Sequence, residues 1–390
     1  MPTATATAAQ EAGRPQPQTT IETSGGPFIR HSQPGRAPIY NVTGTAFGGI
    51  VTQPLVARPG YFRGFRVTQA VSGGTGAVAT FPADTPYNLT ALIQLKDAFG
   101  TPLIVAPGYE VANLLQLYSG GFGINNGTNL ITNLPSFAAF STAGNGSFNY
   151  MLPLEFAKAY GVLSAANASL LPTLQFNYNA AATFYTVQPT GTPVIQTLVD
   201  TDFYWLPEGV AIEPPGLGTT RQWLLQQANP TIPISSAVRV QLPRLGGYLD
   251  TLIFEIRDTT GARTDGYWPG GSGAAPGTIA QPRTSRLQIY VDGVPLIDST
   301  MDEIFDDMWI QYGAVTRPAG VVAITRKNAI NQQSLGLLDT GEAFLSTNPA
   351  TLLEVNFAPT GAGTSGPAQM SVIVGQVVPT GALIQGLPEV

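Results

Sequence analysis

Short apolar runs alternate with turns along most of the chain, from about residue 38 onward. The runs are rich in β-branched and aromatic residues and are bounded by glycine or proline, which is typical of β-strands. In the first half we expect strands at Phe65–Val71, Leu89–Leu95, Asn149–Phe156, Leu174–Tyr178 and Thr201–Leu206. In the second half we expect strands at Val238–Leu242, Thr251–Arg257, Leu287–Val291, Val321–Thr325, Leu352–Phe357 and Met370–Val378. The pattern predicts an all-β protein.

One hairpin pattern occurs twice. In the first half, a strand at Ile93–Asp97 is followed by a turn that ends at Gly100. In the second half, a strand at Leu287–Asp292 is followed by Gly293. The strand after each turn begins with the same three residue types, which are Pro102, Leu103 and Ile104 in the first copy and Pro295, Leu296 and Ile297 in the second. An Asp/Gly turn between two apolar runs predicts a β-hairpin.

Each hairpin is followed by apolar residues with the three- and four-residue spacing of one helical face. The first set is Val111, Leu114, Leu115 and Tyr118, and the second is Met301, Ile304, Phe305, Met308, Trp309 and Tyr312. Thr300 and Glu303 have the spacing of a capping box at the start of the second helix. We therefore expect a short helix after each hairpin, with Tyr118 and Tyr312 at matching positions.

A further match lies upstream, where Gly60–Val67 resembles Gly247–Phe254. Gly247 lies 187 residues after Gly60, and Pro295 lies 193 residues after Pro102. Matches that keep their order and approximate spacing indicate an internal duplication. Antiparallel sandwiches of the resulting size are commonly jelly rolls, which limit exposed sheet edges. The predicted fold is two tandem eight-stranded jelly rolls, each with a short helix after its internal hairpin.

The duplication predicts a division into domains. Residues 1–37 are rich in Thr, Ala, Pro and Gln and are expected to form a flexible N-terminal arm. The first jelly roll is expected at 38–215, a linker at 216–235, and the second jelly roll with a C-terminal tail at 236–390. The linker is placed where Glu213–Gly218, Pro230 and Pro233 interrupt the strand pattern.

The scarcity of charge changes the picture of the surface. The chain has 18 basic and 24 acidic residues among 390, and its net charge is -6. Charged residues make up 11% of the chain, against roughly 25% in an ordinary soluble domain. The centres of subunit interfaces are depleted of charged residues, so repeated interfaces would account for this composition. A pI near 4.8 without a basic block argues against a nucleic-acid-binding surface.

Several other classes are excluded by single residue types. The chain has no cysteine, which excludes a disulfide scaffold, a thiolate metal site and a cysteine nucleophile. Its one histidine, His31, lies in the expected arm, where no second histidine completes a site. No apolar run approaches 18 residues and no basic leader is visible, so we expect neither a membrane span nor a Sec-type signal.

The sequence resembles the double jelly-roll major capsid proteins, most closely those of tectivirus-like tailless icosahedral dsDNA phages with an internal membrane. Three features carry the resemblance. They are Pro243–Tyr248 leading into the strand at Leu252, the paired hairpin–helix units, and Phe148–Phe156 followed by the later strands of the first roll. The resemblance covers roughly residues 38–385.

The resemblance implies a homotrimer that forms a pseudo-hexagonal capsomer and tiles an icosahedral virion shell. The implied partners are neighbouring capsomers, penton and minor capsid proteins, with no specific nucleic acid. The implied location is the virion, after synthesis in the host cytoplasm. In such proteins the N-terminal segment lies inside the shell, near an internal membrane. Here the arm is Thr- and Pro-rich and shows no clear amphipathic helix, so a membrane contact through it stays open.

Carboxylates gather around the predicted second helix, at Asp298, Asp302, Glu303, Asp306 and Asp307. We interpret Asp298, Asp302 and Glu303 as interacting favourably with the helix dipole at its N-terminus. Asp306 and Asp307 are expected on the solvent-exposed face of the helix. The alternative is a divalent-cation site, for which Asp302 and Asp306, one turn apart, are weak candidates. We expect no catalytic residue, no cofactor-binding residue and no cofactor.

Two other classes of function stay open beside a structural protein. A glycosidase would need two of the carboxylates Glu155, Asp200, Asp202 and Glu255 at the required separation, which nothing in the sequence provides. A two-domain β-sandwich carbohydrate-binding or spike protein would need exposed aromatic residues, for which Tyr267 and Trp268 at the start of a long loop are candidates. Arginines near strand starts are expected in ion pairs, and these are Arg63, Arg66, Arg239, Arg244 and Arg257.

The duplication makes a geometric prediction. If the two halves of the structure are superposed, Pro102 should fall on Pro295 and Tyr118 should fall near Tyr312. A superposition that puts these pairs on different elements would overturn the repeat.

Overall fold

The computed structural model describes residues 26–56, 60–115, 140–156, 159–165, 171–207, 212–214, 218–232, 237–242, 246–268, 286–312, 318–325, 345–347, 351–358 and 368–379. Nearly all of these residues belong to β-strands or to the turns between them. Within these ranges no helix is long and apolar enough to cross a bilayer.

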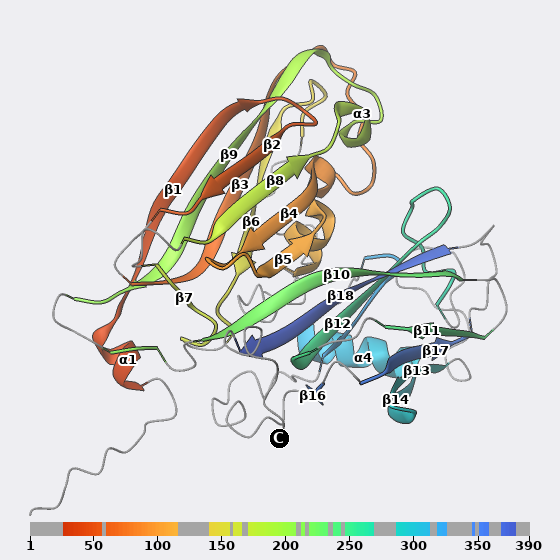
Figure 1. The fold of residues 1–390 in the computed structure, drawn as a ribbon. Helices are drawn as coiled ribbons and strands as arrows, with labels where there is room; N and C mark the ends of the chain where they lie inside the picture. The colour runs from red at the N-terminus through yellow and green to blue at the C-terminus, as the bar shows by residue number, and fades with distance from the viewer. Residues whose placement is uncertain are drawn as a thin grey trace, which may run out of the picture.

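The first roll is a sandwich of two antiparallel sheets (Figure 1). Its eight main strands are β1 (Gln33–Thr45), β2 (Ile50–Pro54), β3 (Tyr61–Thr75), β4 (Thr90–Lys96), β5 (Pro102–Ala106), β6 (Gly146–Pro153), β8 (Thr173–Tyr178) and β9 (Thr190–Trp205). One sheet has the order β1-β9-β3-β6 and the other the order β2-β8-β4-β5. The smaller elements are α1 (Gly26–His31), η1 (Tyr87–Leu89), η2 (Glu110–Leu114), β7 (Leu163–Ser164), which pairs with β3, and α3 (Ala181–Phe184).

The second roll repeats this arrangement. Its eight main strands are β10 (Thr219–Ile232), β11 (Val238–Gln241), β12 (Tyr248–Arg257), β13 (Arg286–Val291), β14 (Val294–Thr300), β15 (Val321–Thr325), β17 (Leu353–Phe357) and β18 (Ala368–Pro379). Their sheets have the orders β10-β18-β12-β15 and β11-β17-β13-β14, with the short β16 (Leu345–Ser346) beside β12. Numbered along the chain, the eight strands of each roll stand in the orders 1-8-3-6 and 2-7-4-5. The predicted fold, two tandem eight-stranded jelly rolls, is confirmed.

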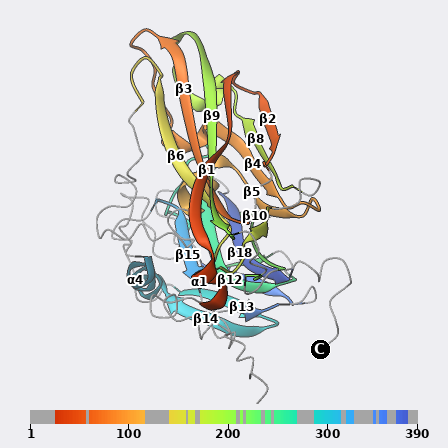
Figure 2. The same cartoon turned by 90° about the vertical axis from the view of Figure 1, so that its left-hand side faces the viewer.

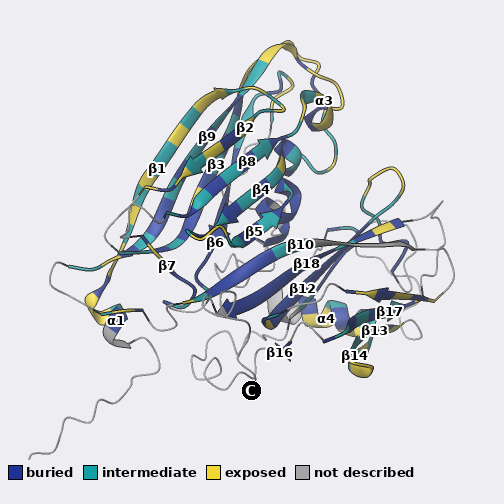
Figure 3. Cartoon of the chain, viewed as in Figure 1, coloured by how far each residue is buried: buried dark blue, intermediate teal, exposed yellow. Residues whose placement is uncertain are grey.

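Alternating side chains explain how the strands form a sandwich. In β8, Leu174, Phe176 and Tyr178 are buried, and the residues between them are partly exposed. This two-residue period places every second side chain between the sheets. In the second roll, buried residues continue along both faces of β12 (Figure 3).

The two repeated hairpins are present and share an irregularity. In β4–β5, Leu95 lies opposite Ile104, and the next pair is Lys96 with Pro102. In β13–β14, Ile289 lies opposite Ile297, and the next pair is Tyr290 with Pro295. Each hairpin therefore has a bulge immediately after its proline, at Leu103 and at Leu296.

Short helices follow both hairpins. The first begins with the π-helical turn η2 (Glu110–Leu114), and Tyr118 lies outside the described residues. The second, α4 (Met301–Tyr312), has the predicted capping box, because the Thr300 backbone N–H donates to Glu303 at 2.7 Å. The Glu303 backbone N–H donates in return to the Thr300 hydroxyl at 3.3 Å.

The rolls share one continuous sheet. Strand β5 of the first roll pairs in parallel with β10 of the second, with Trp223 opposite Ile104 and Leu224 opposite Val105. This pairing joins half of each roll into a nine-stranded sheet, and one cluster of buried side chains extends through both rolls. Figure 2 shows β10 and β18 directly below the sheet of the first roll.

The predicted linker at 216–235 is wrong, because β10 occupies residues 219–232. The prolines around this segment were interpreted as interrupting the strand pattern, so the strand was not predicted from the sequence. Pro230 fits into β10 because the pairing with β18 shifts register between Ala228 and Ile232, where a ladder position is skipped.

The predicted arm is also too long, since α1 and the start of β1 lie within residues 1–37. Phe28 of α1 is 1% exposed and packs edge-on against Tyr61 and Tyr204, with ring centroids 5.6 and 5.3 Å away. His31 lies exposed at the end of α1. One aromatic anchor, which composition does not reveal, holds this segment on the first roll.

We expect Phe28→Ala to lower the free energy of unfolding by about 3 kcal/mol, because it removes a buried aromatic side chain and leaves a cavity. Urea denaturation of the full chain measures the change. The matched control is Phe99→Ala in the β4–β5 turn, where Phe99 is 66% exposed and the loss should stay within about 0.5 kcal/mol. Equal effects for both variants would contradict the anchoring role of α1.

Candidate functional site

A cluster of ion pairs closes the junction between the rolls. Asp84, in the loop before β4, accepts from Arg257 at 2.7 Å and from Arg263 at 2.7 Å. Arg257 ends β12 and Arg263 lies in the turn that follows it, so both arginines come from the second roll. Tyr109 of the first roll lies beneath the Arg263 guanidinium, 4.2 Å from its ring centroid.

Two glutamates meet inside this cluster, Glu110 of η2 and Glu255 of β12, and both are buried. Glu255 also lies 2.7 Å from Arg257. The cluster holds the three carboxyl groups of Asp84, Glu110 and Glu255 but only two guanidinium groups. Burial raises the pKa of Glu255 well above its ordinary value, and the nearby Glu110 raises it further. Protonation of Glu255 leaves two carboxylates facing two guanidinium groups, which balances the charge of the cluster.

A second set of arginines lies on the outer face of the β1-β9-β3-β6 sheet. The two Asp202 oxygens accept from Arg36 at 2.8 Å and from Arg66 at 2.9 Å. Both arginines remain accessible to solvent, because their side chains are 54% and 43% exposed.

Glu155 forms a similar ion pair at the end of this sheet, with Arg63. It accepts from Arg63 at 2.7 Å, from the Tyr204 hydroxyl at 2.7 Å and from the Ala159 backbone N–H at 2.6 Å. Ala159 has a φ of 65°, a left-handed conformation that costs energy for any residue with a Cβ. The Glu155 carboxylate holds this strained turn in place.

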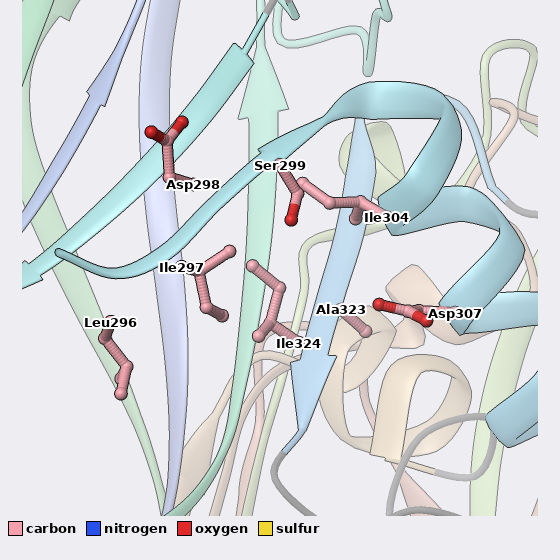
Figure 4. Close-up of a pocket in the computed structure, with 8 residues that line it drawn as sticks. All are labelled: Leu296, Ile297, Asp298, Ser299, Ile304, Asp307, Ala323 and Ile324. Carbon is pink, nitrogen blue, oxygen red and sulfur yellow. The ribbon is translucent and has the colours of Figure 1, made fainter.

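A pocket of about 210 Å³ lies in the second roll between β14, α4 and β15 (Figure 4). It is lined by Leu296, Ile297, Asp298, Ser299, Ile304, Asp307, Ala323 and Ile324. In Figure 4 the Asp307 carboxylate points from α4 toward Ala323 of β15. Burial raises the pKa of Asp307, and the like charges of Asp306 and Glu303 raise it further. The pocket therefore has apolar walls and an acidic rim.

The weak metal candidates Asp302 and Asp306 both lie on α4, and Asp306 is exposed. Within the described ranges, no group of three or more acidic or histidine side chains has the geometry to hold a metal ion. The expectation of ion pairs is confirmed for Arg63, Arg66 and Arg257, and for Arg239, which pairs with Glu354. Arg244 lies outside the described residues.

The alternative of an exposed aromatic site at Tyr267 and Trp268 is contradicted, because both side chains are fully buried. The Trp268 ring lies 5.4 Å from Phe357 and 6.3 Å from Phe254, which places it between the two sheets of the second roll. The loop expected from Trp268 onward thus starts with two core residues. This removes the residues on which a carbohydrate-binding interpretation depended.

Several large apolar side chains do remain exposed. Phe99, in the turn between β4 and β5, and Val294, the first residue of β14, are each 66% exposed. The others are Ile50, Val56, Val78, Val187, Trp205 and Tyr248. Most of these residues lie at strand ends or in turns.

No protein-family model and no curated protein sequence matches the chain. Solved structures do match. The STIV major capsid protein has a TM-score of 0.59 at 15% identity, over 91% of this chain and 100% of that chain. A chain in the atomic structure of Sulfolobus Turreted Icosahedral Virus has a TM-score of 0.58 at 15% identity, over 91% of this chain and 94% of that chain.

PBCV-1 VP54, solved by crystallography and fitted into a reconstruction of the virophage Sputnik, has a TM-score of 0.56 at 12% identity. The match covers 89% of this chain and 94% of that chain. These structures share one fold with this chain, and it is the double jelly roll of viral major capsid proteins. At such low identity the likeness establishes the fold alone.

The glutamate pair makes stability depend on pH. The pKa of Glu255 in the folded protein lies above its ordinary value of 4.5. Its contribution to stability is therefore complete below that value and is lost as the pH rises through the folded pKa. We expect the melting temperature of the wild type to fall over this interval, and Glu255→Gln, which mimics the protonated acid, to flatten the decline.

The matched control is Asp298→Asn, because a hydrogen bond from Arg286 lowers the pKa of Asp298. The contribution of Asp298 to stability has the opposite pH dependence: it is lost as the pH falls through its lowered pKa. Melting curves of both variants at several pH values test the assignment. A Glu255→Gln variant with the wild-type slope on the alkaline side would refute it.

Proposed function

We propose that this chain is a viral major capsid protein and that it assembles with copies of itself into the virion shell. The observation that carries the proposal is the strand order, 1-8-3-6 and 2-7-4-5, present twice in one chain. The STIV major capsid protein and PBCV-1 VP54 share this fold over most of their length. The proposed activity is structural, without a catalytic step.

The proposed unit is a homotrimer. Three chains supply six rolls, which form a pseudo-hexagonal capsomer that packs against neighbouring capsomers and against penton and minor capsid proteins. Exposed apolar side chains on strand ends and hairpin turns support this arrangement, because burying them between chains is favourable. A tailless phage with an internal membrane is the proposed kind of virus, with synthesis in the host cytoplasm and the N-terminal segment toward the inside.

We also propose that the two rolls arose by duplication and divide between β9 and β10, after Trp205 and before Thr219. The bulges after Pro102 and Pro295 support this equivalence. A second shared shift supports it upstream. The register of β3 against β9 shifts between Phe62 and Gly64, and that of β12 against β18 shifts between Leu249 and Thr251, 187 residues later.

The carboxylates considered for a glycosidase favour a structural function as well. Asp202 is tied to Arg36 and Arg66, Glu155 to Arg63, and Glu255 to Arg257. Glu255 lies at the junction of the two rolls, whereas Asp202 lies on the outer face of a sheet of the first roll. The Asp202 pairs link β9 to β1 and β3, the Glu155 pair links β3 to the segment after β6, and the Glu255 pair lies within β12.

Sedimentation of the purified full chain tests the proposal. We expect a species of about 123 kDa, three times the chain mass of 40.9 kDa, that persists on dilution because a large interface dissociates slowly. Electron microscopy at higher concentration should show hexagonal particles. A clean monomer at micromolar concentration would refute the proposed function.

A further inference from the structure

The junction inside the chain uses one strand edge of each roll and leaves the corresponding edges at the outside. In the junction, the fifth strand of the first roll, β5, pairs with the first strand of the second roll, β10. The fifth strand of the second roll is β14, and the first strand of the first roll is β1. In the part of the chain that the structure describes, both end their sheets. We propose that β14 of one copy pairs in parallel with β1 of the next copy, which repeats the β5–β10 junction between chains.

The proposal rests on the self-assembly proposed above and adds its register. In the first roll Asp202 lies opposite Gly64 and also opposite Arg36. In the second roll Gly375 lies opposite Thr251 and also opposite Trp223. Gly64 and Thr251 directly follow the shared register shift, so Arg36 holds the position of Trp223.

On the other side of the joint, the bulges after the two prolines place Ile297 in the position of Ile104. Because Trp223 lies opposite Ile104, the proposed register puts Arg36 opposite Ile297 of the next chain. The following pair, Ala37 and Asp298, then takes the place of Leu224 and Val105.

Side-chain burial differs between the β5–β10 junction and the outer edge strands β1 and β14. Trp223 and Ile104 are completely buried inside the chain. At the corresponding positions, Arg36 is exposed and Ile297 is only partly covered. Figure 3 shows this contrast, since exposed residues recur along β1 whereas β12 and β18 are buried except near their ends.

Prolines limit the pairing along β1 to a short stretch. Pro34 and Pro38 flank Arg36 at two residues on either side, and a proline has no N–H to donate. Prolines occur in edge strands where the nitrogen faces away from the sheet. Arg36 alternates with Pro34 and Pro38 along β1, so its backbone N–H also points away from the sheet. A joint centred on Arg36 has room for few residue pairs, as in the β5–β10 junction.

Charge on the two surfaces is complementary. Opposing residues of a parallel pair point to the same face of the sheet, so Arg36 lies on the face of Ile297, which lines the pocket of Figure 4. The rim of that pocket carries Asp307, and the outer face of the first roll carries Arg36 and Arg66. In the junction inside the chain, arginines of the second roll likewise meet Asp84 of the first.

The proposed contact is head-to-tail, since it uses different surfaces of the two copies. Such contacts either close into rings or continue as filaments. The partner is a second copy of this chain, and the ring of the proposed trimer closes after three identical joints. The acidic pocket is then the receptor for the neighbour's arginine face.

Cysteine cross-linking tests the register directly, because the chain has no native cysteine. The variant is the full chain with Ala37→Cys and Asp298→Cys. Opposing residues on adjacent strands have Cβ atoms about 4.5–5.5 Å apart, near the distance that a disulfide spans. After mild oxidation we expect covalent species of two and three chains on non-reducing gels, and none above three.

Each single variant is a control, because one cysteine per chain links two chains at most. A third control is Phe99→Cys with Val187→Cys, two exposed positions outside the joint, which should give no three-chain species. If the double variant does not form the wild-type assembly, Arg36→Cys with Ile297→Cys tests the same register on the other face of the strands.

The outcomes separate this inference from the proposed function. A trimer in sedimentation whose cysteine pairs give no covalent three-chain species overturns the β14–β1 joint and leaves the capsid proposal standing. Covalent species that continue beyond three chains overturn the closed ring. A wild-type monomer in sedimentation refutes the capsid proposal itself.

Discussion

The pairing of β5 with β10 is the constraint on which the rest of the molecule depends. Two residue pairs form the backbone pairing between the rolls, and the Trp223 and Ile104 side chains of one pair are fully buried. Buried backbone donors and acceptors need partners, so the rolls separate only if these groups become unpaired or hydrated. The junction therefore joins the two rolls in one sheet and sets the position of each outer edge.

Scarce charge is concentrated where elements must be held in register. Eight arginines form ion pairs among the described residues, and these are Arg36, Arg63, Arg66, Arg221, Arg239, Arg257, Arg263 and Arg286. The pair of Arg221 with Asp250 is almost completely buried. Removing one partner of such a pair leaves an uncompensated charge, which costs about 3–5 kcal/mol. Buried pairs of this kind penalise any sliding of the strands that carry them.

Local pattern predicts what local forces determine. The hairpins, the helix α4 and the alternating strands were predicted because turn residues, capping and two-residue periods lie within a few positions of each other. Strands β1, β2 and β10 were missed, since proline, glycine and polar residues interrupt their alternation. The cluster of Asp84 with Arg257 was missed for a different reason. Its partners lie 173 residues apart, and only the pairing of the two rolls brings them together.

The order of the strands also has a consequence during synthesis. Strand β5 ends at Ala106, and its partner β10 starts at Thr219, so 112 residues are added between them. At about 5–20 residues per second, the ribosome needs roughly 6–22 s for this stretch. Over that interval the apolar edge of β5 has no native partner in the nascent chain. The time during which β5 can mispair thus follows from the topology. On a crowded polysome, an unpaired β5 edge favours contact with a chaperone or with a neighbouring nascent copy.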